Sequence, residues 1–503
     1  MTRETVAPVA GTIRLGTATG RGVLATTILG SSMAFLDGTV VNIALPTIGG
    51  DFHTTLTGLQ WTVAGYTLTL AAFVLVGGSL GDRYGHRKIF LTGVVWFALA
   101  SLACGLAPNI GFLIAFRTVQ GIGSALLTPG ALALIQAVFH PDDRGKAIGA
   151  WSGLASIAGA AGPLVGGYLI EFASWRWIFL INLPLAAAVV AVALRYVPES
   201  REHAPGRFDI PGTVLGALGL AGVTYALTEA GGRGLGSPRV LAALAIGLGG
   251  LAAFIVVERR SSHPMMPLAL FRSREFSAAN GLTMTAYGAL GALFFFLPTY
   301  LQIVVGYKPL VAGLAQLPVT IVMMLLSSRV GALTGRVGPR RLMTAGGVLT
   351  GVGVLLLGRM GTHPNYLLQI FPGLLVFSFG LVMIAVPVTV TVLAATDPAR
   401  AGIASGVNNA VARAAGALSV AAFPLIVGLS GDGYANASQL EPAFEKAMSL
   451  CAVLFAASAL IAWFGIRDSV TRSTPEHPVD EPQCSTCLPI GSPTLEPDHT
   501  TRP

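Results

Sequence analysis

Residues 78–90 read GSLGDRYGHRKIF, and residues 331–343 read GALTGRVGPRRLM. The two stretches start 253 residues apart, align without a gap, and share Gly, Leu, Arg, Gly and Arg at matching positions. A second pair, DDRGK at 142–146 and DPARA at 397–401, recurs at nearly the same offset. Similarity at one fixed spacing indicates an internal duplication, so we expect two halves with the same fold.

The composition places these halves in a membrane. Of the 503 residues, 53% are hydrophobic and 11% are charged, whereas about 25% of residues are charged in an average soluble domain. The formal net charge of +8 would suit a nucleic-acid-binding protein if the basic residues formed one patch. They lie instead in short loops between apolar runs, so we exclude nucleic acid as a partner.

Fourteen apolar runs are long enough to cross the roughly 30 Å of hydrocarbon in a bilayer. They lie at 22–45, 60–80, 89–107, 110–138, 147–170, 176–197, 210–229, 239–257, 277–300, 309–332, 342–360, 367–393, 402–428 and 446–466. The first run is too long for a signal peptide, and it carries Asp37 and Asn42, so we expect it to remain as a helix.

We therefore predict an all-α polytopic membrane protein with two six-helix pseudo-repeat bundles and two inserted central helices. The expected parts are a cytoplasmic tail at 1–21, a bundle at 22–197, a linker with the two extra helices at 198–276, a bundle at 277–466 and a disordered cytoplasmic tail at 467–503. That last tail is rich in Pro, Ser and Thr and has too few apolar residues to form a core.

The basic residues predict the orientation of the chain. If the N-terminus is cytoplasmic, 23 of the 31 Lys and Arg residues lie on the cytoplasmic side, six lie outside and two fall within the spans. This asymmetry follows the positive-inside rule. We therefore expect a multi-pass protein of the cell membrane with both termini in the cytoplasm.

Five motifs in chain order carry a resemblance to a known family. Besides the loop at 78–90, they are LDGTVVNIALP at 36–46, RTVQGIG at 117–123, GAAGPLVGG at 159–167 and WRWIFLINLP at 175–184. Together they resemble the fourteen-helix drug:proton antiporter branch of the major facilitator superfamily, and the resemblance covers all fourteen expected helices.

The resemblance implies export of a hydrophobic or amphipathic drug, antibiotic or secondary metabolite in exchange for protons, by alternating access. It also implies a protein without a cofactor, surrounded by membrane lipids, which we expect to be a monomer. Two alternatives remain: a proton-coupled transporter of an endogenous lipid or small metabolite, and a membrane sensor that transports nothing. The first would give no drug resistance, and the second would give no substrate-dependent proton flux.

Three charges lie deep within expected helices, where a charge is costly and usually functional. At 1.5 Å per residue, Asp37 and Arg117 lie at similar depth, about 10–13 Å from the same membrane surface. Either they form a fixed ion pair, or Asp37 titrates as its separation from Arg117 changes, because burial favours the neutral carboxyl and a nearby guanidinium favours the charged one. We favour proton coupling by Asp37 and Arg117.

Arg413 lies near the middle of its expected helix, and three roles remain open for it. It pairs with Asp37, it contacts an anionic or carbonyl-bearing group of the substrate, or it binds backbone carbonyls as a structural residue. Glu171 and Glu229 lie near helix ends, where we expect them to be solvated.

Two motifs predict moving parts. In the loop at 78–90, glycines allow a tight turn and charges sit at helix ends, and the resemblance implies a latch between the two halves on the cytoplasmic side. The expected latch residues are Gly78, Asp82, Arg83, Gly85, Arg87 and Lys88. The second copy has Gly335 at the position of Asp82, so we expect that half of the latch to be degenerate. The resemblance also implies an antiporter motif at Gly159, Gly162, Pro163, Gly166 and Gly167, whose small residues permit close helix contact and equally fit ordinary tight packing.

Aromatic, methionine and amide side chains suit a cavity for varied amphipathic ligands. The expected cavity residues are Asn42, Tyr66, Gln120, Met284, Tyr287, Asn409 and Arg413, although each also fits ordinary packing. One deep acid against two arginines disfavours dications as substrates.

The sequence lacks a GxxxxGK[ST] loop, an HExxH helix and a GxSxG turn, so we expect neither ATP hydrolysis nor enzyme activity. We expect no metal site. Cys104 and Cys451 are expected to be packed in the core, and the lone pair Cys484 and Cys487 is expected to be incidental.

Overall fold

The structure is a computed structural model, and it describes residues 13–200, 209–397 and 400–468. The predicted Cys484 and Cys487 pair, and most of both predicted tails, lie outside the described residues. Fourteen helices within these ranges are long and apolar enough to cross a membrane, which confirms the predicted number of spans.

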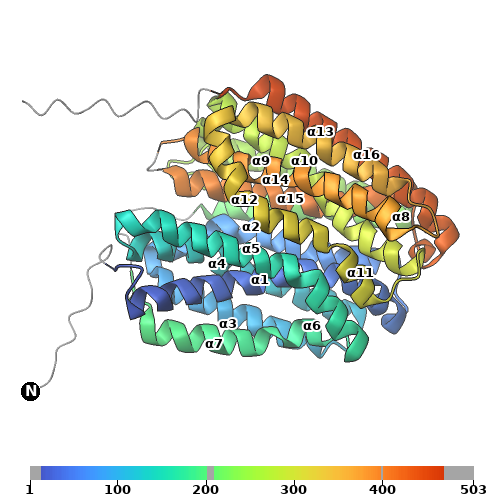
Figure 1. Cartoon of the computed structure of the whole chain (residues 1–503), viewed down its shortest axis with the longest axis horizontal. Coiled ribbons are helices and arrows are strands. Elements are labelled where there is room, and N and C mark those ends of the chain that lie inside the picture. The colour runs from blue at the N-terminus through green and yellow to red at the C-terminus, as the bar shows by residue number, and fades with distance from the viewer. Residues whose placement is uncertain (1–12, 201–208, 398–399, 469–503) are drawn as a thin grey trace, which may run out of the picture. The chain divides into compact units, whose positions relative to one another are not determined.

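The first bundle contains the helices α1 (Ala18–Phe52), α2 (Leu56–Tyr84), α3 (His86–Gly105), α4 (Ile110–Val138), α5 (Pro141–Phe172), α6 (Trp177–Leu180) and α7 (Asn182–Tyr196). Helix α2 packs on α4, α4 on α3, and α1 on α5 and α7 (Figure 1). Glycines permit these close contacts: a Cβ atom on Gly77 would lie 2.1 Å from the carbonyl oxygen of Ala125.

The second bundle repeats this order in its own helices. After a short turn, η1 (Leu268–Arg272), it contains α10 (Arg274–Ile303), α11 (Pro309–Ala315), α12 (Leu317–Val337), α13 (Pro339–Gly358), η2 (Tyr366–Ile370), α14 (Phe371–Ala394), α15 (Ala401–Val427), η4 (Gly433–Ala435) and α16 (Ala437–Gly465). Here α13 packs on α14 and α16, and α10 packs on α15 and α16.

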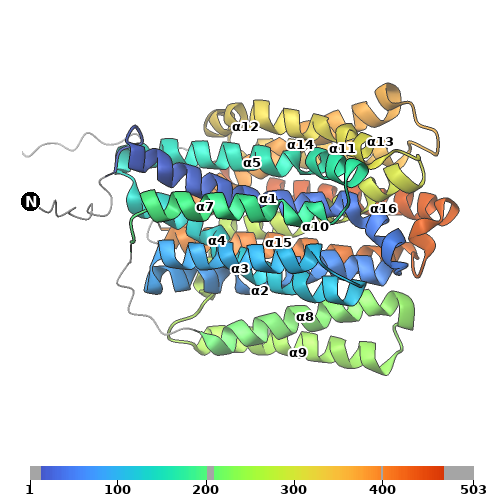
Figure 2. The ribbon, with the colours of Figure 1, turned by 90° about the horizontal axis from the view of Figure 1, so that it is seen from below.

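The two extra helices, α8 (Ile210–Arg233) and α9 (Pro238–Arg260), form a hairpin. Helix α8 packs against α2 of the first bundle and α15 of the second (Figure 2). Glu229 on α8 accepts a hydrogen bond from Trp61 Nε1 at 3.4 Å and pairs with Arg233 at 2.7 Å, so it is not fully solvated as predicted. The hairpin therefore covers the seam where α2 and α15 meet.

Some helices break or begin at residues other than those predicted, because of a proline or an N-cap. The sixth span breaks near Ile181 and the tenth near Gln316, because Pro184 and Pro318 have no N–H to bond the carbonyl four residues earlier. Helix α5 starts at Pro141 rather than near residue 147, with His140 as its N-cap and two aspartates in its first turn. Apolar runs mark the membrane-crossing part of a helix, whereas caps mark its ends.

We call the end of the bundles at which α1 begins the proximal end, and the end at which α1 finishes the distal end. At the distal end the two bundles are joined by hydrogen bonds. Gln60 Nε2 donates to the carbonyls of Val420 at 2.9 Å and Ala421 at 3.1 Å, and Gln302 Nε2 donates to that of Ile43 at 2.9 Å. The two bundles are therefore bonded to each other at the distal end, and this end is closed.

Glu171 strengthens this closure from the first bundle. Its carboxylate lies 3.8 Å from Lys308 Nζ and accepts a hydrogen bond from the backbone N–H of Leu310 at 3.2 Å. Its side chain is 19% exposed, so the prediction that it is simply solvated was wrong. The sequence places Glu171 at a helix end but carries no sign of the partner that approaches from the other bundle.

Candidate functional site

Asp37 lies in the middle of α1, and its side chain is fully buried. One carboxylate oxygen, Oδ2, accepts a hydrogen bond from Arg117 Nη1 at 2.5 Å. The other, Oδ1, accepts one from Gln120 Nε2 at 3.0 Å. Both oxygens of the carboxylate therefore have partners, and both partners come from α4.

Arg117 is the centre of this buried network, with 2% of its side chain exposed. Its Nε donates to the carbonyl of Thr62 on α2 at 3.2 Å, and its Nη1 also donates to Gln120 Oε1 at 2.7 Å. Its guanidinium carbon lies 4.3 Å from the centre of the Tyr66 ring. Three helices, α1, α2 and α4, thus meet at one guanidinium.

A buried pair of this kind can hold or release a proton only if its geometry changes. The carboxylate and the guanidinium compensate each other's desolvation while they touch, and separation would leave each charge exposed to a medium of low dielectric. A carboxyl that loses its guanidinium partner is stabilised by taking up a proton. The arrangement is therefore chemically suited to link proton uptake to movement of α1 relative to α4.

The predicted antiporter motif on α5 packs directly beside Asp37. Thr39 Oγ1, two residues after Asp37, donates to the carbonyl of Gly159 at 2.8 Å. An added Cβ on Gly162 would lie 2.0 Å from Thr39 Oγ1, and one on Gly166 would lie 2.4 Å from a methyl group of Val40. The glycines therefore set the distance between α5 and α1.

The opposite side of the same motif meets the second bundle. A Cβ on Gly167 would lie 2.5 Å from the carbonyl oxygen of Pro309, where α11 begins. A Cβ on Gly313 in α11 would lie 2.2 Å from the carbonyl oxygen of Pro163. Helix α5 thus touches both the Asp37 helix and the second bundle.

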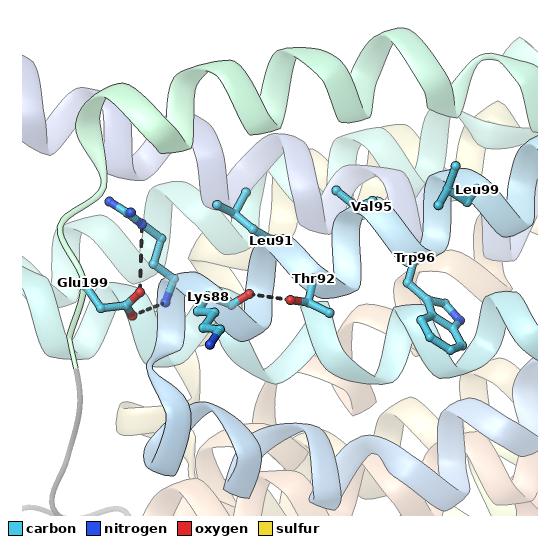
Figure 3. A pocket seen from close by; sticks show the side chains of 8 residues that line it. Lys88, Leu91, Thr92, Val95, Trp96, Leu99 and Glu199 are labelled. Carbon is cyan, nitrogen blue, oxygen red and sulfur yellow. Dashed lines mark hydrogen bonds and ion pairs between the residues drawn. The ribbon is translucent and has the colours of Figure 1, made fainter.

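The predicted latch loop is fastened to the segment that follows α7. Gly85 has a φ of 106°, a value that favours glycine, and it connects α2 to α3. Glu199 Oε1 (Figure 3) accepts a hydrogen bond from the backbone N–H of Arg87 at 3.1 Å. Arg87 Nη1 donates to the carbonyl of Val197 at 2.8 Å. His86 Nε2 lies 3.8 Å from Asp82. Glu199, which sequence reasoning missed, therefore caps the start of α3.

The second copy of the loop has the same cap. Gly338 has a φ of 94°, and Asp468, just after α16, accepts a hydrogen bond from the backbone N–H of Arg340 at 3.1 Å. Each bundle thus ends in a carboxylate that returns to the glycine turn of its own bundle. Aligning the segments that follow the last helix of each half would have revealed this pair of residues.

The other predicted latch residues lie near this cap. Lys88 is exposed beside Arg87 and lines a groove along α3 with Leu91, Val95 and Leu99 (Figure 3). Gly78 faces Pro129 on α4, and Arg83 lies at the end of α2.

The predicted cavity residues fall into two groups. Tyr66 and Gln120 are buried and belong to the Arg117 network, and the Tyr66 hydroxyl also lies 2.9 Å from Ser124 Oγ. The other predicted cavity residues are Asn42, Met284, Tyr287, Asn409 and Arg413. Their side chains are at least partly exposed, and they form no hydrogen bond or ion pair with another described residue. Because Asp37 is held by Arg117, it is not paired with Arg413 in this structure.

The metal-binding side chains give no alternative centre. Across the described ranges, no group of three or more His, Cys, Asp or Glu residues could hold a metal ion. Cys104 and Cys451 are buried and free.

Comparison with known proteins identifies the family. The model of the Major Facilitator Superfamily matches residues 27–420. The chain is 38% identical to the multidrug resistance protein Stp of Mycobacterium tuberculosis (strain CDC 1551 / Oshkosh), over 77% of this chain and 72% of Stp. It is 35% identical to the tetracenomycin C resistance and export protein of Streptomyces glaucescens, over 79% of this chain and 74% of that protein.

Two further similarities extend over more of the chain. The cephamycin export protein CmcT of Amycolatopsis lactamdurans is 33% identical over 92% of this chain and 95% of CmcT. A solved POT family transporter in complex with a thioalcohol-conjugated peptide has the same fold, with a TM-score of 0.67, 12% identity and coverage of 90% of this chain and 97% of that one. The chain therefore belongs to the major facilitator superfamily.

Proposed function

We propose that this protein exports a hydrophobic or amphipathic small molecule, of the drug or antibiotic kind, in exchange for protons. The observation that carries the proposal is the fully buried pair of Asp37 and Arg117 in the middle of the first bundle. Relatives named for multidrug resistance and for antibiotic export support the substrate class. We further propose that it acts as a monomer among membrane lipids, with both termini in the cytoplasm.

Movement at the distal end is the step that we propose controls the proton. Gln302 of the second bundle holds the carbonyl of Ile43, six residues beyond Asp37 on α1 and about 9 Å along the helix. When the bundles separate at this end, α1 is pulled relative to α4. The contact between Asp37 and Arg117 then opens, and the carboxyl takes up a proton from the distal side.

The return movement releases the proton on the proximal side. As the distal hydrogen bonds form again, Arg117 regains contact with Asp37 and displaces the proton. The glycines on α5 give α1 a smooth surface for this displacement, and the loop at 78–90, with its cap at Glu199, acts as the proximal latch. Alternating access thus exchanges one proton for substrate moving outward.

The test is Asp37→Asn in proteoliposomes that contain the purified protein, with a pH gradient and a fluorescent amphipathic dye. The amide keeps the shape of the side chain but cannot bind or release a proton, so gradient-driven dye transport is expected to fall to the level of empty vesicles. Asp51→Asn is the matched control, because Asp51 lies on the same helix at the distal end with a side chain that is 47% exposed.

Undiminished pH-driven transport by Asp37→Asn would rule out the proposed coupling site. Dye-dependent proton movement in wild-type vesicles, followed with an internal pH indicator, separates a transporter from a membrane sensor. Increased antibiotic tolerance of cells that express the wild-type protein separates a drug exporter from a carrier of an endogenous lipid or metabolite.

A further inference from the structure

Arg413 lies at the middle of a membrane-spanning helix. Helix α15 runs from Ala401 to Val427, so Arg413 has twelve helical residues before it and fourteen after it. At 1.5 Å per residue, these correspond to about 18 Å and 21 Å of helix. A guanidinium at this depth is costly unless a partner or a water-filled space receives its charge.

No described residue supplies that partner. Arg413 forms neither a hydrogen bond nor an ion pair with another part of the described chain. Asp37, the carboxylate buried in the middle of α1, has its two oxygens bonded to Arg117 and Gln120 instead. Among Asp37, Arg117 and Arg413, the central region therefore carries one positive charge in excess.

The surroundings of Arg413 are suited to a ligand. Its guanidinium lies within electrostatic range of the phenol groups of Tyr66 on α2 and Tyr287 on α10. Asn409, one helical turn earlier on α15, also has no hydrogen-bonding partner among the described residues. A Cβ added to Gly416, three residues after Arg413, would meet no atom within 4 Å, so open space borders this face of α15.

We propose that Arg413 binds an acidic group of the transported molecule, and that the protein therefore prefers amphipathic compounds bearing a carboxylate or another anionic oxygen. The proposal rests on the proposed export function and specifies its substrate class. A guanidinium presents donors in a planar fork that matches a carboxylate, and an anion in contact with it removes the excess central charge. The Asn409 amide and the Tyr287 ring then provide polar and apolar contacts to the rest of the molecule.

Recognition of the acidic group is distinct from proton coupling. Arg413 belongs to the second bundle, whereas Asp37 and Arg117 belong to the first. Removing the charge of Arg413 is therefore expected to change which molecule binds, and removing the carboxylate of Asp37 is expected to change whether a pH gradient drives it. The two proposals are therefore tested by different substitutions and by different measurements.

The test uses two dyes that differ at a single group. Rhodamine 110 carries a free carboxylate, and rhodamine 123 is its methyl ester. Their affinities for the purified full-length protein in lipid nanodiscs are measured by fluorescence polarisation, with empty nanodiscs subtracted. We expect the wild-type protein to bind rhodamine 110 at least about tenfold more tightly than rhodamine 123.

Arg413→Gln is expected to reduce that preference to less than about threefold, because the protein loses the guanidinium that binds the carboxylate of rhodamine 110. Arg413→Lys keeps the positive charge but loses the planar guanidinium donors, so it is expected to show an intermediate preference for rhodamine 110. It also provides a folded variant for the comparison if Arg413→Gln does not fold. Asp37→Asn is expected to keep the full preference while losing pH-driven transport.

Several results would overturn the proposal. They are equal affinity of the wild-type protein for the two dyes, absence of measurable rhodamine 110 binding, and an unchanged preference in a folded Arg413→Gln protein. A wild-type protein that prefers rhodamine 110 but shows no pH-driven transport would instead count against the proposed function, and would leave Arg413 as the binding residue for the acidic group.

Discussion

At the scale of single residues, the Asp37 carboxylate accepts its hydrogen bonds from α4: Arg117 and Gln120 lie about one helical turn apart, and each binds one oxygen. A buried charge whose partner is removed costs about 3–5 kcal/mol, whereas removing both charges together costs much less. The pair is therefore expected to be strongly coupled in stability as well as in function.

A double-mutant cycle tests this coupling. Arg117→Ala is expected to lower the free energy of unfolding by about 3–5 kcal/mol, because it leaves Asp37 buried without its counter-ion. Adding Asp37→Asn to that variant should recover a large part of the loss. Thermal unfolding of the four purified proteins in one detergent gives the comparison. Simple additivity of the two substitutions would mean that the pair is not energetically coupled.

Residue depth could be predicted from the sequence, and side-chain direction could not. Counting residues along two expected helices placed Asp37 level with Arg117, and the structure joins them. The same counting cannot say which face of a helix looks inward, so it could not show that Tyr66 and Gln120 pack around Arg117. Glu171 shows the same limit, since its partner Lys308 lies far away in sequence.

At the scale of elements, the glycines of α5 determine how closely it approaches α1. An extra methyl group in a tightly packed contact costs about 1–3 kcal/mol, because neighbouring atoms have to move. The contact at Gly162 involves Thr39, two residues from Asp37, so its distortion is expected to affect the proton site as well as stability.

Gly162→Ala is expected to lower the free energy of unfolding by about 1–3 kcal/mol and to slow pH-driven transport. The matched control is Gly153→Ala on the same helix, where an added Cβ meets no atom within 4 Å. That control should be neutral or slightly stabilising, because alanine favours helix more than glycine does. Equal effects of the two substitutions, measured by thermal unfolding, would show that the contact with Thr39 is not what Gly162 provides.

The paired caps at Glu199 and Asp468 give a second prediction at this scale. Each carboxylate accepts a backbone hydrogen bond at the start of a helix, where negative charge is also favoured by the helix dipole. Glu199→Ala and Asp468→Ala are each expected to cost about 0.5–2 kcal/mol. Hydrogen exchange should accelerate at the first turns of α3 and α13 respectively, and unchanged exchange in both turns would contradict the capping role.

Element boundaries were predictable only where the sequence carries a local signal. Pro184 and Pro318 mark the two helix breaks, and His140 with Pro141 marks the start of α5. A search for apolar runs does not detect such polar or proline positions. It also does not detect capping residues such as Glu199, which lie beyond the last apolar residue.

At the scale of the whole transmembrane region, the distal hydrogen bonds favour one state of an alternating cycle. Gln60 contributes two cross-bundle bonds and Gln302 contributes one. Each bond is worth about 1 kcal/mol, so its loss shifts the ratio of closed to open distal ends by roughly fivefold.

Spin labels can measure that shift. In a protein whose native cysteines are replaced by serine, labels at Leu106 and His363 report the separation of the two bundles at the distal end, where both positions are exposed. The combination of Gln60→Ala and Gln302→Ala is expected to populate longer label distances than the parent protein. An identical distance distribution would show that these bonds do not hold the distal end closed.

The duplication predicted the two bundles because a repeated sequence folds into a repeated structure. It could not predict the position of α8 and α9, because neither helix has a counterpart in the other half. Their packing against α2 and α15 depends on single contacts such as the hydrogen bond from Trp61 to Glu229. Such contacts leave no periodic pattern in the sequence.

The excess positive charge at Arg413 has a consequence for the energy available to the exporter. If each cycle moves a monoanion outward and one proton inward, two positive charge equivalents enter the cell. A membrane voltage of 100 mV contributes about 2.3 kcal/mol for each of them, or about 4.6 kcal/mol in all, even without a pH gradient. That amount sustains a concentration ratio of roughly 2,000-fold. An exporter of acids built in this way would be driven mainly by voltage, and its activity would appear as an electric current across the membrane.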